Sequence, residues 1–311
     1  MSLAATGTHR VHVRAPGKIN VFFEVGDVQD DGYHDVASVY QAVSLYEDVW
    51  VEPAAEYAIE VTGDVDITGV PLDDRNLALR AARLMAHELG WDGGIHVRVH
   101  KGVPVAGGMG GGSADAAAAL LAVNELLGGG RSTAELHQLA AQLGADVPFA
   151  LMGGTAVGTG RGDELAPALV RGRFDWVLVT QTEGLSTPEA YAGLDALRAQ
   201  ADISPQRGVP SVAAPVLHAL RAGDAVALAD AIHNDLQAVA VGRRPELGRL
   251  IDEGVRRGAL AGIVSGSGPT VAFAVPDDIA AIDLAATLTT LGHDALPVHG
   301  PVPGARVISV D

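Results

Sequence analysis

Short runs of β-branched and aromatic residues dominate the first hundred positions, and glycine, proline or aspartate separates one run from the next. Such runs predict strands, here over 11–13, 19–25, 36–45 and 48–52. A further strand is predicted over 95–99, where apolar and polar residues alternate, because this spacing gives a strand one buried face. The N-terminal region is therefore expected to be rich in strands.

Apolar residues at intervals of three and four predict the first helix over 76–89. Asp73 or Asp74 is the expected N-cap of this helix, and Gly90 lies just beyond its end. The next helix is predicted over 113–127, directly after a run of glycines.

A third helix begins at a capping box formed by Ser132 and Glu135 and runs to Leu143. The second helix extends roughly 22 Å and the third roughly 18 Å at 1.5 Å per residue. A short glycine turn joins them, so they predict an antiparallel hairpin that returns Asp146 to the glycine run. The alternative is that Asp146 only caps a short helix that starts near Pro148.

The second half of the chain mixes strands and helices without a regular alternation. A strand is predicted over 176–180, a strand pair around Gly266 and a further strand at the end of the chain. Helices are predicted over about 188–200, 211–221, 225–242, 245–257 and 278–291, with a surface loop over 201–210. This order indicates an α+β protein of two domains, divided into residues 1–165 and 166–311.

The composition is that of a globular protein, with 48% hydrophobic and 19% charged residues among 311. The absence of cysteine excludes disulfides, thiolate metal sites and a cysteine nucleophile. A formal net charge of −17 argues against nucleic-acid binding, which requires Lys and Arg to replace counterions, but permits a small anion in a local pocket. Lys18 and Lys101 are the two lysines of the chain.

One uncharged stretch, over 258–275, is long enough to raise the question of a membrane span. It contains four glycines and a proline, a pattern that favours two short buried strands around a turn. The first ten residues lack the apolar core of a signal peptide. A cytoplasmic protein that binds no membrane is therefore expected.

The glycine run carries the clearest chemical signal. Residues 104–115 read Pro-Val-Ala-Gly-Gly-Met-Gly-Gly-Gly-Ser-Ala-Asp, between a predicted strand and a predicted helix. Glycines let successive amides converge on an anion at the positive end of a helix dipole, so the loop predicts phosphate binding. Ser113 is the expected N-cap, and its hydroxyl is an alternative partner for a phosphate or a metal. The other reading of the loop is a plain connecting turn.

A second signal is Ala-Pro-Gly-Lys-Ile-Asn at 15–20, which places Lys18 beside an apolar strand. The apolar neighbours suggest that the lysine stem is buried, which requires an anionic partner for its ammonium. The alternative is a solvated surface lysine.

Taken together, these segments resemble the GHMP kinase superfamily, which includes galactokinase, homoserine kinase and mevalonate kinase. The glycine loop is similar to the ATP-phosphate motif of that family, although Ala114 and Asp115 follow Ser113 where some relatives have a second serine. Val-Ser-Gly-Ser-Gly-Pro-Thr at 264–270 is similar to its C-terminal glycine motif. Within the family, the segments 15–20, 31–34 and 143–148 resemble those of members that phosphorylate a methylerythritol linked to cytidine diphosphate.

The resemblance covers essentially the whole chain and implies a role for each segment. The nucleotide would be bound by Pro104, Val105, Ala106, Gly107, Gly108, Met109, Gly110, Gly111, Gly112, Ser113 and Ala114, with Asn76 and Lys101 nearby. The catalytic pair would be Lys18 and Asp146. The substrate would be held by Asn20, Tyr33, His34, Thr187, Tyr191, Gly266, Ser267 and Gly268.

The implied cofactor is ATP with Mg²⁺, whose protein ligands the sequence does not identify, and the implied partner is a small molecule. Tyr191 has the alternative of an ordinary helix aromatic, and the glycines at 266–268 have that of a tight turn. Two competing functions remain: a GHMP kinase of homoserine or mevalonate type, and a sensor that binds nucleotide without catalysis. The presence of both Lys18 and Asp146 argues against the sensor, which would need neither.

Overall fold

The structure is a computed structural model that describes residues 9–105, 107–181, 184–200 and 209–311. The described strands are β1 (Val11–Val28), β2 (His34–Ala54), β3 (Ala58–Gly63), β4 (Gly94–Lys101), β5 (Thr155–Thr159), β6 (Glu164–Pro167), β7 (Phe174–Val179), β8 (His233–Asn234), β9 (Ala261–Val264), β10 (Val271–Val275), β11 (Ala295–Gly300) and β12 (Arg306–Val310). The described helices are α1 (Leu77–Glu88), α2 (Gly111–Leu126), α3 (Thr133–Leu143), α4 (Val147–Met152), α5 (Thr187–Gln200), α6 (Ala214–Ala222), α7 (Ala225–Ala231), α8 (Gln237–Arg243), α9 (Pro245–Arg256) and α10 (Asp278–Thr290).

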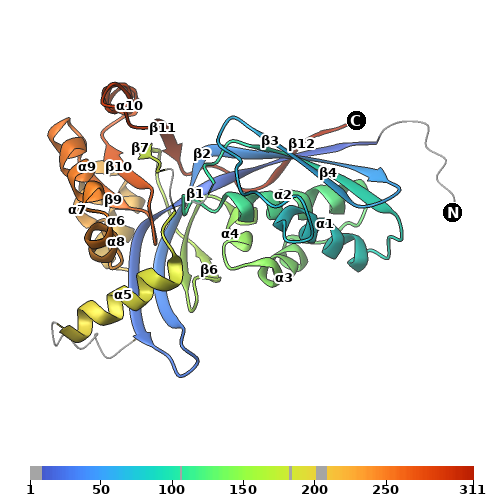
Figure 1. The fold of residues 1–311 in the computed structure, drawn as a ribbon, viewed down its shortest axis with the longest axis horizontal. Helices are drawn as coiled ribbons and strands as arrows, with labels where there is room; N and C mark the ends of the chain where they lie inside the picture. Colours follow the sequence, from blue (N-terminus) through green and yellow to red (C-terminus); the bar gives the residue numbers. More distant parts are fainter. Residues whose placement is uncertain (1–8, 106, 182–183, 201–208) are drawn as a thin grey trace.

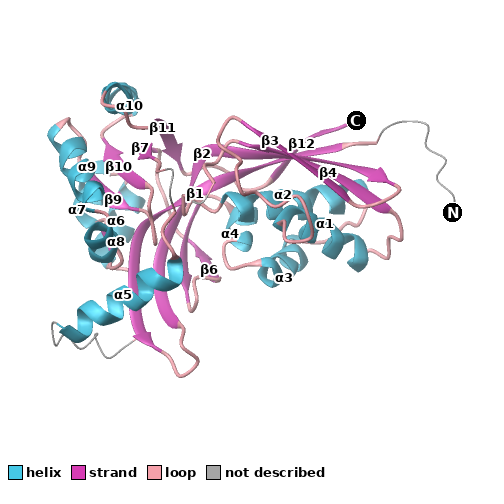
Figure 2. Cartoon of the chain, in the orientation of Figure 1, coloured by secondary structure: helices cyan, strands magenta, loops and turns pink. Residues whose placement is uncertain are grey.

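The first sheet has the order β12-β1-β2-β4-β3, and helices α1 to α4 cover one of its faces (Figure 2). β5 and β8 extend this sheet by pairing with β2 and β1, and β6 pairs with β5. β1 and β2 form a long antiparallel ribbon that runs through both parts of the molecule (Figure 1). The breaks predicted within 11–25 and within 36–52 are therefore wrong, because each range lies in one continuous strand. Pro16 and Gly17 stay extended inside β1, where the pairing register shifts.

The second sheet has the order β11-β7-β10-β9, and α9 and α10 pack on it. The uncharged stretch at 258–275 forms β9, a turn and β10, as predicted. In the described residues, none of the helices is both long and apolar enough to cross a membrane. The helix predicted over 225–242 is wrong, because it is broken by β8, where Asn234 donates hydrogen bonds to the carbonyls of Val264 and Gly266 (both 2.7 Å).

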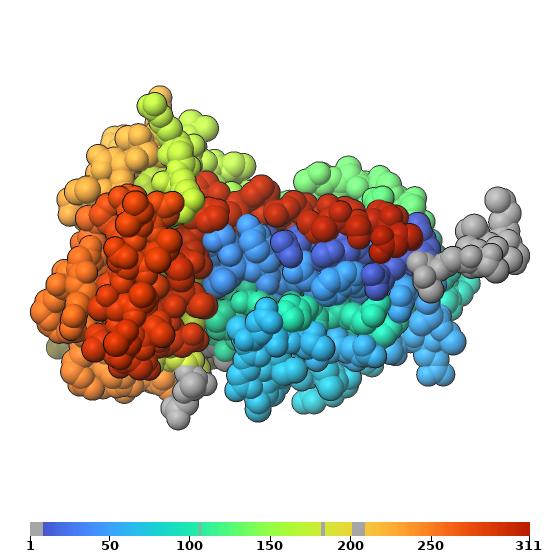
Figure 3. All heavy atoms as spheres, turned by 90° about the horizontal axis from the view of Figure 1, so that it is seen from above, coloured from blue at the N-terminus to red at the C-terminus, as the bar shows by residue number. Residues whose placement is uncertain are grey.

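The chain ends in two strands rather than the one predicted. β11 belongs to the second sheet, whereas β12 returns to the first sheet and pairs with β1. Figure 3 shows this last strand, in red, lying along the blue N-terminal strands. A cluster of buried side chains joins the ribbon to the second sheet, including Ile19, Phe22, Trp176 and Ile263. Each such side chain contributes about 1.5–3 kcal/mol by its burial, so packing fixes the two parts relative to each other.

Helix starts show where local prediction succeeded and where it failed. The capping box of Ser132 and Glu135 is formed at α3, as predicted. The N-cap of α1 is Asn76, whose Oδ1 accepts from the Ala78 amide at 2.9 Å. The prediction of Asp73 or Asp74 as this cap is wrong, because the Asp73 carboxylate instead accepts from the Arg75 backbone and guanidinium.

Candidate active site

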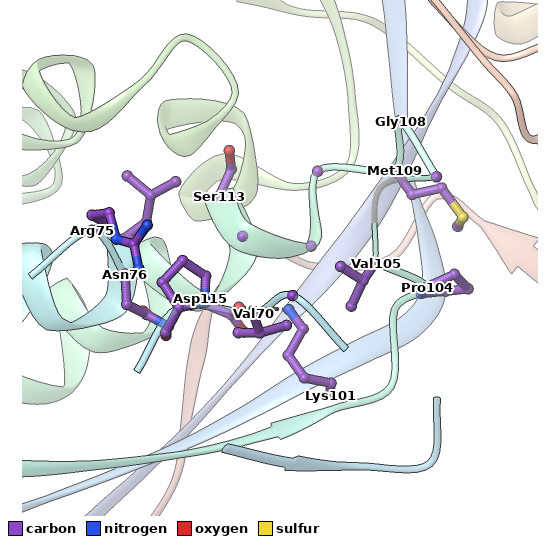
Figure 4. Close-up of a pocket in the computed structure, with 17 residues that line it drawn as sticks. Val70, Arg75, Asn76, Lys101, Pro104, Val105, Gly108, Met109, Ser113 and Asp115 are labelled. Carbon is purple, nitrogen blue, oxygen red and sulfur yellow. Dashed lines mark hydrogen bonds and ion pairs between the residues drawn. The ribbon is translucent and has the colours of Figure 1, made fainter. Parts of the chain in front are cut away.

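The glycine loop and the first turn of α2 line a cavity of about 370 Å³ (Figure 4). Gly110, with φ of 70°, is the N-cap of α2. The prediction of Ser113 as N-cap is wrong, because the left-handed conformation of Gly110 starts the helix two residues earlier than predicted. Ser113 instead lies in the first turn and lines the cavity. The amides of this turn have no partner within the helix, so this end of the cavity suits a phosphate.

Most of the predicted nucleotide residues line this one cavity. They are Asn76, Lys101, Pro104, Val105, Gly107, Gly108, Met109, Gly110, Gly111, Gly112 and Ser113. Ala114 is buried beside it, and its amide donates to the Gly110 carbonyl at 2.8 Å instead of facing the cavity. Ala106 lies outside the described residues.

Gly110→Ala is predicted to weaken ATP binding. A Cβ at Gly110 would lie 3.3 Å from Lys18 Cγ and would sit on a left-handed backbone. The strain costs about 1–2 kcal/mol, and relief of it displaces the amides that face the phosphates. We expect ATP affinity, measured by calorimetry, to fall about tenfold or more.

The matched control is Gly128→Ala, because Gly128 has φ of 61° and nothing within 4 Å of its added Cβ. This variant carries the same backbone strain far from the cavity. Both variants should lose similar melting temperature, and only Gly110→Ala should lose ATP affinity. Equal ATP affinities in the two variants would contradict the assignment of the loop.

Lys18 and Asp146 meet beside the glycine loop. Lys18 is held on β1, where its backbone amide donates to the Met109 carbonyl at 2.9 Å. Its ammonium donates to Asn20 Oδ1 at 2.8 Å and lies 3.7 Å from Asp146 Oδ2. The Lys18 side chain is 11% exposed and that of Asp146 is 32% exposed. Lys18 is therefore a buried lysine with an anionic partner, as predicted, and not a solvated one.

Asp146 occupies the N-cap position of α4, but its side chain makes no capping hydrogen bond. The alternative that the Asp146 side chain only caps α4 is therefore not supported. The α2–α3 hairpin returns Asp146 to the loop as predicted, because its Oδ2 lies 3.9 Å from the Cβ position of Gly110. The carboxylate lines a second cavity, described below, with its Oδ2 toward Lys18.

Asn20 connects the first sheet to the second glycine motif. Its amide nitrogen Nδ2 donates to Ser38 Oγ at 2.8 Å, and its backbone N–H donates to Ser265 Oγ at 3.0 Å. A Cβ at Gly266 would lie 2.9 Å from Asn20 Oδ1, so the absence of a side chain there permits this approach. These contacts fix the orientation of the amide oxygen that accepts from Lys18.

The two glycine motifs pack against each other. Thr270 Oγ1 donates to the Gly107 carbonyl at 2.7 Å. A Cβ at Gly108 would lie 2.9 Å from the Gly268 carbonyl oxygen. Gly268, predicted to bind substrate, therefore lies against the first glycine loop and does not line the second cavity described next.

A second cavity, of about 230 Å³, lies beside Lys18 and Asp146. It is lined by the predicted residues Lys18, Asn20, Asp146, Thr187, Tyr191, Gly266 and Ser267, together with Phe23, Val36, Tyr40, Gly108, Gly110, Arg161 and Leu236. Burial, and after it the charge of Asp146, raises the pKa of Tyr191 to about 12. The same two causes raise the pKa of Tyr40.

Two of the predicted substrate residues, His34 and Tyr33, do not line this cavity but contact residues that do. The His34 ring lies 5.1 Å from that of Tyr191, and its Nε2 hydrogen-bonds Asp195 Oδ1 at 2.9 Å. Tyr33 is 58% exposed and packs against the guanidinium of Arg161. Thr187 and Ser267 share a hydrogen bond of 3.0 Å between their hydroxyls, which joins α5 to the second glycine motif.

Sequence reasoning missed several residues of the site. Tyr40 and Arg161 line the cavity, and Asn234 supports the second glycine motif. The one available signal for Arg161 was its place in a Gly-Arg-Gly turn, which exposes a side chain between two flexible residues. Tyr40 and Asn234 have no local signal, because their partners lie far away in the chain.

A buried ionic group underlies the phosphate loop. The Lys101 ammonium lies 2.6 Å from Glu47 Oε1 and 2.5 Å from Asp115 Oδ2, and all three side chains are almost fully buried. Figure 4 shows Lys101 and Asp115 pointing toward each other at the edge of the cavity. Lys101 thus lines the first cavity, but its ammonium is already paired with two buried carboxyl groups. Burial and then the charge of Asp115 raise the pKa of Glu47 to about 8.

The raised pKa of Glu47 predicts a pH-dependent stability. The folded protein holds this proton at pH values where the unfolded chain has released it, so stability falls as pH rises from about 4.5 to about 8. Glu47→Gln removes the titration. We expect the free energy of unfolding in urea to change less across this range in the variant than in the wild type.

The control is Glu56→Gln, at an exposed glutamate, which should keep the wild-type pH dependence. If the free energy of unfolding falls as steeply with rising pH in Glu47→Gln as in the wild type, the carboxyl group of Glu47 does not hold this proton.

Oxygen ligands for a metal are sparse at the site. Among the residues that the structure describes, no three His, Asp or Glu side chains are grouped to hold a metal ion. The two cavities combine a glycine loop at the start of a helix, a buried lysine and a carboxylate, and such groups suit the transfer of a phosphoryl group to an alcohol.

This chain belongs to the GHMP kinases. Residues 76–154 match the family described as GHMP kinases N terminal domain, and residues 216–294 match GHMP kinases C terminal. The chain is 53% identical to the 4-diphosphocytidyl-2-C-methyl-D-erythritol kinase of Clavibacter michiganensis subsp. michiganensis, over 99% of this chain and 100% of the relative. It is 48% identical to the enzyme of the same name from Mycolicibacterium smegmatis, over 97% of this chain and 93% of the relative.

Solved structures agree with this membership. A crystal structure of 4-(cytidine 5'-diphospho)-2C-methyl-D-erythritol kinase superimposes with a TM-score of 0.75 at 28% identity, covering 93% of this chain and 98% of that one. Homoserine kinase from Cytophaga hutchinsonii shares the fold, with a TM-score of 0.73 at 17% identity, covering 99% of this chain and 100% of that one. The predicted α+β fold and the family resemblance are confirmed.

Proposed function

We propose that this protein is an ATP-dependent kinase that phosphorylates the 2-hydroxyl of 4-diphosphocytidyl-2-C-methyl-D-erythritol, a step of the non-mevalonate route to isoprenoids. The observation that carries this function is the full-length identity of about half of all residues to kinases of that name. The site is consistent with it, because a phosphate loop and a second cavity meet at Lys18 and Asp146. The homoserine and mevalonate alternatives are not favoured, since those relatives share only the fold.

The catalytic roles follow from the geometry of the pair. Asp146, one-third exposed at the cavity, is the base that accepts the proton of the substrate hydroxyl. Lys18 keeps a positive charge beside the reacting oxygen, where negative charge develops, and Asn20 holds that ammonium in place. The amides at the start of α2 orient the phosphates of ATP, and the helix dipole favours their charge.

Magnesium ions accompany ATP in this proposal. Ser113 lines the first cavity, and its hydroxyl makes no hydrogen bond to any residue that the structure describes. The Asp146 carboxylate lines the second cavity, and its Oδ2 lies 3.9 Å from the Cβ position of Gly110 in the same loop. These oxygen donors suit a hard cation that keeps most of its ligands from phosphates and water. When bound, the ion neutralises charge on the phosphates.

The cytidine end of the substrate is assigned to the aromatic side of the second cavity. Tyr191 offers a ring for stacking, with His34 beside it and Thr187 and Ser267 at its edge. Tyr33 lies outside this cavity and reaches the substrate only from the rim.

We further propose that the chain divides near residue 165 into a nucleotide domain and a substrate domain, with the site between them. Strands β1 to β6 belong to the first sheet, and the second sheet begins at β7. Among the described strands that follow β7, β8 and β12 are exceptions, because they pair in the first sheet. Because the reaction consumes ATP, we place it in the cytoplasm.

A substrate panel in a coupled assay for ADP release tests the function. The cytidyl substrate should be turned over, whereas homoserine and mevalonate should not. Turnover of homoserine without turnover of the cytidyl compound would overturn the proposal. Binding of ATP without phosphoryl transfer to any of these alcohols would favour the sensor.

A further inference from the structure

Arg161 stands at the rim of the substrate cavity without a place in the mechanism above. It lies in the turn between β5 and β6 and lines the cavity together with Lys18, Asp146 and Tyr191. The turn is anchored to the first sheet, because the Val36 amide donates to the Gly160 carbonyl at 2.7 Å. The position of Arg161 is therefore set by the sheet and not by a free loop.

The guanidinium of Arg161 has a defined orientation and unused donors. Its carbon Cζ lies 4.1 Å from the centre of the Tyr33 ring, and its Nη2 pairs with Asp31. Asp31 is the one side chain that hydrogen-bonds Arg161 among the described residues. A guanidinium carries five N–H donors, so stacking on Tyr33 leaves an edge with donors for an anion.

The charges that line the cavity point to the nature of that anion. Lys18, Asp146 and Arg161 are the charged side chains among the described lining residues. The Lys18 ammonium is engaged by Asn20 and Asp146 at the reacting end. Of the cations among the described lining residues, this leaves Arg161, which is half exposed and has Asp31, itself exposed, as its one ion-pair partner in the described part of the chain. An exposed pair of this kind contributes little.

We propose that Arg161 binds the diphosphate of the substrate and so selects acceptors that carry one. This proposal rests on the proposed function, in which the diphosphate joins the methylerythritol to the cytidine. With the hydroxyl at Lys18 and Asp146 and the base at Tyr191, the diphosphate lies between these ends of the cavity that Arg161 lines. A guanidinium binds phosphate oxygens through two parallel hydrogen bonds. On binding, the Arg161 guanidinium would exchange its ion pair with Asp31 for these bonds.

Binding of cytidine and of CDP to the free enzyme, measured by calorimetry, tests the proposal without turnover. In Arg161→Gln, CDP affinity should fall about 10- to 100-fold, because a hydrogen-bonded charge is lost. Cytidine affinity should stay at the wild-type value. The matched control is Arg221→Gln on α6, an exposed arginine outside the cavity, which removes the same charge and should change neither affinity.

Asp31→Asn separates ligand binding from a structural role. If Arg161 binds the diphosphate, loss of its competing partner should leave CDP affinity unchanged or raise it. If Arg161 serves only to hold the β1–β2 turn and Tyr33, then Asp31→Asn should weaken CDP as much as Arg161→Gln does. The latter result overturns the proposal.

Two further results would also overturn it: an equal loss of cytidine and CDP affinity in Arg161→Gln, or no loss of either. In steady-state assays, the variant should raise KM for the cytidyl substrate and leave kcat and KM for ATP near the wild-type values. If the wild type fails to turn over the cytidyl substrate but binds CDP through Arg161, the proposed function fails, and the assignment of Arg161 as a diphosphate-binding residue is supported without it.

Discussion

Asp146→Asn should reduce kcat by about 10³-fold or more while the protein remains folded, because an amide cannot accept the hydroxyl proton. The side chain is isosteric and makes no capping hydrogen bond in α4, so no cap is lost. KM for ATP should stay near the wild-type value, since the phosphates are held by the glycine loop. Steady-state kinetics and a thermal melt of the same sample measure both effects.

A crossed control uses Asp277, which caps α10 by accepting from the Ala280 amide at 2.9 Å. Asp277→Ala should lose about 1 kcal/mol of stability and keep its activity. Asp146→Ala should keep its stability and lose its activity. A folded Asp146→Asn with wild-type kcat would leave the site without a base, and the mechanism would be wrong.

Lys18→Met is expected to lower kcat by about 10²- to 10³-fold, because it removes the positive charge at the reacting oxygen. Methionine keeps most of the buried stem, so the packing against Gly110 is retained, whereas the ammonium that faces the ring of Tyr40 is lost. ATP affinity by calorimetry should change little, since the amides of the loop remain.

Lys18→Arg tests whether charge alone is sufficient. The space around the ammonium is fixed by Asn20 at 2.8 Å and Asp146 at 3.7 Å, and a planar guanidinium does not fit the position of a compact ammonium. We expect this variant to stay well below wild-type kcat. Full activity in either variant would contradict the catalytic role of Lys18 and leave it with a structural role alone.

Local pattern was sufficient for several features of the site. The glycine loop, the capping box at Ser132 and the hairpin that returns Asp146 all depend on residues that are close in the chain. Helix length and glycine conformation are local properties, so the sequence predicted where the carboxylate and the phosphate loop would meet. The burial of Lys18 followed from its apolar neighbours in the same strand.

Breaks between elements were predicted less well. Pro16 and Gly17 interrupt a strand in local propensity, yet β1 continues through them because β2 pairs along its length. The helix expected over 225–242 gives way at Asn234, whose side chain is required by two carbonyls about thirty residues later. In both cases tertiary hydrogen bonds outweigh local preference.

Element order and motifs were sufficient to predict the α+β class and the family, which are confirmed. They also predicted a phosphate-binding loop and a pairing of Lys18 with Asp146. Long-range packing, in contrast, returns β12 to the first sheet, brings Glu47 and Asp115 to Lys101, and places Arg161 at the second cavity. The physical reason is distance along the chain. Backbone propensity and spacing act over a few residues, whereas the partner of a buried charge or of an edge strand is set by the packing of the whole fold.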